Sequence, residues 1–148
     1  MTTLLVGPET FTYTGIQLFR VLRDDENPAN GLHPKDPNGT QTIESHVSYG
    51  SYILSQYIST CADYISAVNW AHKDQNKTLT KRIAVIDANV LRSRNIKMTD
   101  LTKYNAYLGQ KAYNYANCYN EVLVEGFIPS EAITNIKLIC LSKPIEYQ

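Results

Sequence analysis

The sequence SQYISTCADYISAVNWA, Ser55–Ala71, decides how the rest of the chain is interpreted. Residues Gln56–Thr60 have the composition of a short strand that ends in small polar residues. Asp63 then lies near the start of a predicted helix, where a carboxylate accepts hydrogen bonds from free N–H groups. The helix is predicted because apolar side chains recur at the spacing of one helix face: Tyr64, Ala67, Val68 and Ala71. The stretch therefore predicts a strand, a tight Ser-Thr-Cys corner and an amphipathic helix.

The length and composition indicate one globular domain. The chain has 148 residues, 43% hydrophobic and 19% charged, and this is enough to bury a substantial core. We expect a single domain over residues 1–148, in which residues 1–14 form an N-terminal arm. The formal net charge of +0 argues against binding a long nucleic-acid backbone, which requires a basic surface, although a local basic pocket for one small anion remains compatible with it.

The cysteines and the apolar runs predict the cellular compartment of the protein. The three cysteines, Cys61, Cys118 and Cys140, lack metal-ligand spacing and are typical of free thiols in a reducing compartment. The N-terminal residues have no basic region and too short an apolar run for a signal peptide, and no apolar run approaches the length of a membrane span. We therefore expect a soluble protein in the cytoplasm of its own or of a host cell, with no membrane partner and no metal site.

The remaining segments predict short strands and two helices, an α+β pattern rather than a regular βαβ alternation. Met98–Gly109 has helical spacing, with Asp100 near its start, and Arg23–Thr42 is a long loop rich in proline and glycine. Loops of this length in compact domains are often functional. The predicted strands are Gly15–Leu22, a buried central strand Arg82–Ala88, Glu121–Phe127 and Asn135–Leu141.

Four polar residues within this pattern have both a structural and a functional interpretation. Arg20 lies inside an apolar strand, where it needs an anionic partner, an internal salt bridge or an exit to solvent. Glu121 begins a strand, and taken alone it is a surface charge at a strand end. Ser59 alone is a helix cap, and His46 alone is a structural or surface histidine. Their order along the chain favours the functional interpretation.

Four segments carry a resemblance to a known family: FRVLR (Phe19–Arg23), SHVSYG (Ser45–Gly50), YISTC (Tyr57–Cys61) and NEVLVEGFIPSEAI (Asn120–Ile133). In order and spacing they resemble the arginine–serine–glutamate class of mono-ADP-ribosyltransferases, and in particular the branch that includes the cholera and pertussis toxin catalytic subunits. The resemblance implies an α+β ADP-ribosyltransferase fold, a split and mostly antiparallel β-sandwich with short helices around an NAD cleft. It also implies a toxin-like effector with transferase activity.

The resemblance assigns roles to individual residues. Glu121 corresponds to the catalytic glutamate and Ser59 to the first serine of a Ser-Thr-Ser strand end. NAD binding is expected from Arg20, His46, Ser59 and Thr60. The sequence departs from the family pattern at two positions. Cys61 replaces the third residue of the Ser-Thr-Ser motif, and Tyr119 stands where arginine-modifying members carry a second glutamate.

The chemistry explains why such residues are needed. Cleavage of the nicotinamide–ribose bond develops positive charge on the ribose, which a fixed carboxylate at Glu121 stabilises more in the transition state than in the ground state. The Ser59 hydroxyl would help to hold that carboxylate. Arg20 would bind the diphosphate or the adenosine ribose, because a guanidinium matches phosphate oxygens. Tyr119 and Tyr115 are expected to recognise the acceptor.

The sequence thus predicts transfer of ADP-ribose from NAD, without metal, to a macromolecular acceptor. The acceptor is expected to be a protein side chain other than arginine, and protein is favoured over nucleic acid. Two alternatives remain open. One is hydrolysis of NAD without a dedicated acceptor, and the other is a degenerate module that binds NAD or a partner without turnover.

Overall fold

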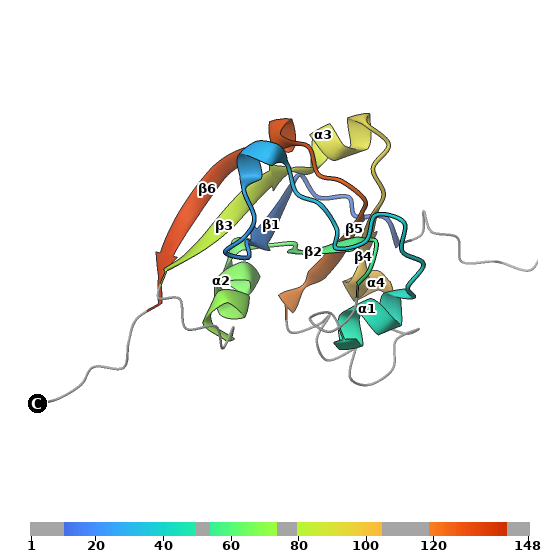
Figure 1. Ribbon diagram of the computed structural model, residues 1–148, viewed down its shortest axis with the longest axis horizontal. Helices are drawn as coiled ribbons and strands as arrows, with labels where there is room; N and C mark the ends of the chain where they lie inside the picture. The colour runs from blue at the N-terminus through green and yellow to red at the C-terminus, as the bar shows by residue number, and fades with distance from the viewer. Residues whose placement is uncertain (1–10, 50–53, 74–79, 105–118, 142–148) are drawn as a thin grey trace, which may run out of the picture.

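The computed structural model describes residues 11–49, 54–73, 80–104 and 119–141, which form one antiparallel sheet with short helices (Figure 1). The strands lie in the order β4-β5-β2-β1-β3-β6. They are β1 (Gln17–Val21), β2 (Tyr57–Cys61), β3 (Thr80–Asp87), β4 (Met98–Asp100), β5 (Glu121–Glu125) and β6 (Ile133–Cys140). The helices are α1 (Ile43–Tyr49), α2 (Tyr64–Lys73), α3 (Ala88–Ser93) and α4 (Leu101–Tyr104), with 3-10 turns at Pro28–Asn30 and Ser130–Ala132.

Helices pack on both faces of the sheet, because side chains along each strand point alternately to opposite faces. On the face that carries Leu18 and Ile58, the core is completed by α3 through Leu91. The opposite face is covered in two parts (Figure 1). Helix α2 packs on β1 and β3, whereas α1 and α4 cover β2 and β5 around Leu123. The second face therefore has a seam between two helical groups.

The sheet is nearly divided between β1 and β2. These strands share one pair of Cα partners, Phe19 and Cys61, whereas β1 with β3 and β2 with β5 each form five pairs. Strands β4, β5 and β2 therefore make one half and β1, β3 and β6 the other. The halves separate immediately beyond the shared pair, between Arg20 and Ser59. This division corresponds to the split predicted from the sequence, here within a single antiparallel sheet.

The predicted α+β class, the antiparallel sheet and most strands are confirmed. The corner after Ser55 is also confirmed, because β2 leads directly into α2 and the Asp63 carboxylate accepts a hydrogen bond of 2.8 Å from the Ser66 N–H at the start of that helix. The strand expected at Arg82–Ala88 lies between β1 and β6, as predicted for a central strand. It ends one residue earlier, because the Asp87 side chain caps α3, which the sequence did not predict.

Two other segments differ from their predictions. Met98–Asp100 is not helical: these residues form edge strand β4 by pairing with Val122–Val124. The helix begins only at Leu101, where the Asp100 carboxylate accepts hydrogen bonds from Thr102, and residues 105–109 lie outside the described part. Helix α1 was likewise missed. The Thr42 hydroxyl caps it by accepting a hydrogen bond of 3.0 Å from the Ser45 N–H.

The N-terminal arm and the long loop are tied to the sheet where they are described. Thr12 forms an isolated bridge with Thr99 of β4, and residues 1–10 of the arm lie outside the described range. Leu32, in the long loop, bridges to Ile128 with hydrogen bonds of 2.8 Å in both directions. The loop that follows β1 is therefore hydrogen-bonded to the segment that follows β5.

Candidate functional site

Glu121 is a buried carboxylate at the start of β5, with 2% of its surface exposed. Its Cα partner on β2 is Cys61, so Ser59, two residues away, lies on the same face of the sheet. Burial raises the pKa of Glu121 to about 7, although a hydrogen bond from Ser59 and the charge of Arg20 both lower it. No donor among the described residues reaches its buried Oε2 atom. This oxygen needs a donor from elsewhere.

His46 of α1 holds the Ser59 hydroxyl from the other side. The ring is 7% exposed, with Nε2 2.7 Å from Ser59 Oγ and Nδ1 2.5 Å from Ser55 Oγ. Burial lowers the pKa of His46 to about 4, and the charges of Arg20 and Lys35 add to the effect. The imidazole is therefore neutral at pH 7, with one nitrogen as donor and the other as acceptor.

The hydrogen-bond directions in this group follow from the chemistry of Glu121. An ionised carboxylate can only accept, so Ser59 donates its proton to Glu121. Nε2–H of His46 must then donate to Ser59 Oγ, and Nδ1 accepts from the Ser55 hydroxyl. The Ser55 oxygen also accepts a hydrogen bond of 3.3 Å from the Tyr57 N–H. A directed chain thus runs from Ser55 through His46 and Ser59 to Glu121.

Arg20 is engaged in an internal salt bridge with Glu26, one of the alternatives that the sequence left open. Its Nη2 donates to Glu26 Oε1 at 3.0 Å, and its Nε lies 3.2 Å from Oε2. Its Nη1 donates to the Ser59 carbonyl at 2.8 Å, across the split between β1 and β2. These contacts use three of the five guanidinium N–H groups, and the described residues leave one on each terminal nitrogen without an acceptor.

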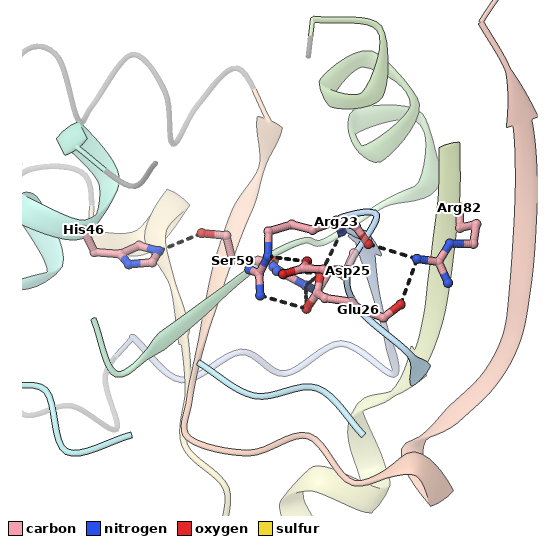
Figure 2. A network of polar contacts seen from close by, with 7 residues as sticks. Arg23, Asp25, Glu26, His46, Ser59 and Arg82 are labelled. Atoms are coloured by element: carbon pink, nitrogen blue, oxygen red, sulfur yellow. Dashed lines mark hydrogen bonds and ion pairs between the residues drawn. The ribbon is translucent and has the colours of Figure 1, made fainter. Parts of the chain in front are cut away.

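The turn after β1 holds Glu26 in place, and Figure 2 shows His46 on one side of Ser59 and this turn on the other. The Arg23 N–H donates to Glu26 Oε1 at 2.8 Å. Arg82 of β3 donates from Nη2 to the carbonyls of Arg23 (2.9 Å) and Glu26 (2.8 Å). Sequence reasoning missed Glu26. Its only signal was an acidic run directly after a strand whose buried arginine needed an anion.

Thr60, one of the four residues expected to bind NAD, does not face Ser59 and Glu121. Its hydroxyl donates to the Val122 carbonyl at 2.7 Å, and strand alternation places it on the sheet face opposite to Ser59. It therefore ties β2 to β5. Cys61, opposite Glu121, is a buried free thiol. Burial and the neighbouring carboxylates raise its pKa, so it remains protonated.

Tyr119 is packed in the core below α2. It is 9% exposed, its ring centroid lies 4.9 Å from that of Trp70, and Lys73 Nζ lies 5.5 Å from its ring centroid. Tyr115, the other residue expected to recognise an acceptor, lies outside the described residues. The position two residues before Glu121 thus holds a neutral, largely buried ring.

A hollow of about 490 Å³ lies over β1, β3 and β6, beside the start of α2. Phe19 is paired with Cys61, which is paired with Glu121, so two strand spacings of about 5 Å each separate the backbone of Phe19 from that of Glu121. The lining of the hollow combines aromatic, amide, hydroxyl and ammonium groups: Gln17, Phe19, Tyr64, Val85, Thr134, Asn135 and Lys137. None of these residues belongs to the group formed by Glu121, Ser59, His46 and Arg20, so the hollow is separate from the buried carboxylate.

The described residues contain no group of three or more His, Cys, Asp or Glu side chains arranged to hold a metal ion. No helix among them has the length and apolar character needed to cross a membrane.

Comparison with known proteins identifies the fold. A family model described as "Domain of unknown function (DUF7587)" matches residues 10–142, and a search of curated proteins finds no match. The solved structure named EcPltA aligns with 17% identity and a TM-score of 0.53 over 79% of this chain and 71% of that chain. At this identity the likeness concerns the fold, which is that of a pertussis-like toxin catalytic subunit. The fold predicted from the sequence is thereby confirmed.

Proposed function

The chain belongs to the family described as "Domain of unknown function (DUF7587)", and for it we propose an NAD-dependent mono-ADP-ribosyltransferase activity. The observation that carries this proposal is the buried carboxylate of Glu121, whose Oε2 has no donor among the described residues. A ribose hydroxyl of NAD would supply that donor. A buried oxygen without a hydrogen bond costs about 1–3 kcal/mol, and a ligand that donates to it removes part of that cost.

Glu121 would act through charge. NAD supplies the nicotinamide–ribose bond, and its cleavage leaves positive charge on the ribose. A carboxylate fixed in a site of low polarity stabilises that charge more strongly than water does. Because the pKa of Glu121 is about 7, the group is ionised in about half of the molecules at neutral pH and in most of them at pH 8.

Ser59 and His46 would position Glu121 for this role. The chain of hydrogen bonds from Ser55 through His46 orients the Ser59 hydroxyl so that it donates a hydrogen bond to the Glu121 carboxylate. This hydrogen bond favours the ionised form of Glu121 and fixes its orientation. The low pKa of His46 keeps the ring neutral, and a neutral ring maintains one donor and one acceptor. Thr60 supports the same strand from the opposite face.

Arg20 would bind the diphosphate of NAD with the N–H groups that Glu26 and Ser59 leave available. Its charge already lowers the pKa values of both Glu121 and His46, so the three groups are electrostatically coupled. Glu26 would orient the guanidinium and neutralise part of its charge. Arg20 is therefore both a structural bridge across the split and a phosphate ligand.

The acceptor that we propose is a macromolecule with a reacting group other than an arginine side chain. The supporting observation is Tyr119, whose ring packs on Trp70 where arginine-modifying relatives carry a second glutamate. An uncharged ring offers no anionic docking point for a guanidinium. The same observation favours a second candidate, hydrolysis of NAD with water as the acceptor. If the site has no group that binds an acceptor side chain, water can react with the ribose instead.

Labelled NAD separates these activities. The protein is incubated with NAD labelled in the adenylate, with and without a cell lysate. Transfer predicts label on macromolecules that depends on the lysate, whereas hydrolysis predicts free ADP-ribose in both samples. If the folded protein gives neither product, the proposal of turnover is wrong.

A further inference from the structure

The residue before Glu121 has an unusual backbone conformation. Asn120 has φ of 46°, in the left-handed region that non-glycine residues seldom adopt. Asparagine adopts this conformation more readily than other non-glycine residues, and here its side chain and carbonyl are also held by hydrogen bonds. The conformation occurs where the chain turns into β5, so it sets the direction in which the strand and the Glu121 side chain begin.

The contacts that impose this conformation come from the corner between β2 and α2. The Asn120 side chain donates from Nδ2 to Asp63 Oδ2 (2.7 Å) and Ser66 Oγ (3.0 Å). Its carbonyl accepts a hydrogen bond of 2.9 Å from the Ala62 N–H. Three contacts therefore fasten one residue, and none of them involves β5 itself.

Asp63 connects this corner to α2. One carboxylate oxygen accepts from the Ser66 N–H at 2.8 Å, and the other accepts from both the Ser66 hydroxyl (3.1 Å) and Asn120. Hydrogen bonds from Ser66 and Asn120 lower the pKa of Asp63 despite the opposing effect of its desolvation, so it remains ionised near pH 7. The Asp63 carboxylate thus both caps α2 and holds the Asn120 side chain.

We propose that Asn120 and Asp63 are positioning residues, which hold the Glu121 carboxylate in its buried place by fastening the start of β5 to the start of α2. The inference rests on the proposed function for its catalytic consequence only. Neither residue touches the reacting atoms in this scheme; both act through Glu121.

The first test measures the titration of Glu121 in the ligand-free protein by carboxyl carbon NMR, with Glu121→Gln to assign the resonance. Asn120→Gly removes the side-chain anchor but tolerates the left-handed conformation. Asn95→Gly is the matched control, since Asn95 also has a positive φ (58°) and follows α3. We expect the Glu121 midpoint to fall toward that of an ordinary glutamate in Asn120→Gly and to stay unchanged in Asn95→Gly. An unchanged midpoint in Asn120→Gly overturns the proposal.

The second test exchanges the donor and the acceptor. Asn120→Asp places two carboxylates together and should lower kcat about tenfold or more, with KM for NAD within about threefold of the wild-type value. In the double variant Asp63→Asn/Asn120→Asp, the amide is at position 63 and the carboxylate at position 120, so the hydrogen bond can form in the opposite direction. Asparagine at position 63 remains a good helix cap. At pH 8.5, where Glu121 is ionised, kcat should recover to within about threefold of wild type. A double variant no better than Asn120→Asp contradicts the proposal.

The two tests also separate this inference from the proposed function. The titration requires neither NAD nor turnover, so it decides the positioning role even in a protein that releases no nicotinamide. Loss of turnover in the wild-type protein, together with the expected change in titration, would refute the enzyme activity and leave the positioning role intact.

Discussion

The guanidinium of Arg20 donates a hydrogen bond of 2.8 Å to the main-chain carbonyl of Ser59, at the point where β1 and β2 diverge. In a continuous sheet a strand N–H would fill this position. A charged side chain fills it instead, and Glu26 balances its charge. The split therefore places a cation within the electrostatic range of Ser59 and Glu121 without leaving a backbone carbonyl unpaired.

Removal of the Arg20 side chain should destabilise the fold strongly. Arg20→Ala leaves the buried Glu26 carboxylate without its partner, which typically costs about 3–5 kcal/mol. Denaturant unfolding measures the change. Arg94→Ala is the matched control, because it removes an exposed ion pair with Glu131, for which we expect less than about 1 kcal/mol. Equal losses in the two variants would show that the pair at the split has no special structural role.

Glu121 should destabilise the native state as pH rises. Its pKa is about 7 in the folded protein against an ordinary value of 4.5, so the folded state retains a proton that the unfolded state has released. The stabilising contribution is complete below about pH 4.5 and is lost as pH rises to 7, by about 3 kcal/mol. Glu121→Gln should therefore exceed wild type in stability by a larger margin at pH 8 than at pH 4.5.

Glu125→Gln is the control for this comparison, since Glu125 lies exposed at the other end of β5. Its stability relative to wild type should stay constant with pH. If the stability of Glu121→Gln relative to wild type is also independent of pH, then Glu121 does not have the raised pKa that its burial implies.

His46 should give the opposite dependence. Its pKa is about 4 in the folded state against 6.5 in the unfolded state, so its contribution is present above pH 6.5 and is lost as pH falls through 4, by about 3 kcal/mol. Between pH 4.5 and 6.5 this slope opposes that of Glu121. His46→Asn should remove it, and unfolding measured at several pH values will reveal this. The exposed His33 provides the control, and a similar change in His33→Asn would contradict the assignment.

The acceptor prediction can be tested with agmatine, a small arginine analogue. Because Tyr119 is uncharged and packed on Trp70, we expect agmatine to be modified no faster than water reacts. Efficient modification of agmatine by the wild-type protein would show that Tyr119 does not exclude a guanidinium. Product analysis by mass spectrometry distinguishes ADP-ribosyl-agmatine from free ADP-ribose.

The order of the four motifs was enough to predict the fold. It was also enough to predict that Arg20, His46, Ser59 and Glu121 lie near one another, and all four meet around Ser59. Strand alternation places Ser59 and Glu121 on one face, whereas Arg20 reaches the main-chain carbonyl of Ser59 across the split between β1 and β2. Helix α3 was not predicted because it follows β3 without a turn and has only six residues. Strand β4 was missed because its three residues are held as a strand by pairing with distant segments, β5 on one side and Thr12 on the other.

Glu26 and Asn120 could not be assigned from the sequence for a different reason. Glu26 follows two other acidic residues, and only the fixed turn selects it as the partner of Arg20. The conformation of Asn120 depends on Asp63, which is 57 positions away in the chain. Contacts between distant segments determine both roles, and no local spacing signals them.

Release of nicotinamide from labelled NAD at pH 8 tests the central claim most directly, since both transfer and hydrolysis produce it. The wild-type protein should release nicotinamide, and Glu125→Gln should do so within about twofold of that rate. Glu121→Gln keeps the shape of the side chain and removes its charge, so its rate should fall by about 10²-fold or more. Release at the wild-type rate by Glu121→Gln, or none by the folded wild-type protein, would contradict the account.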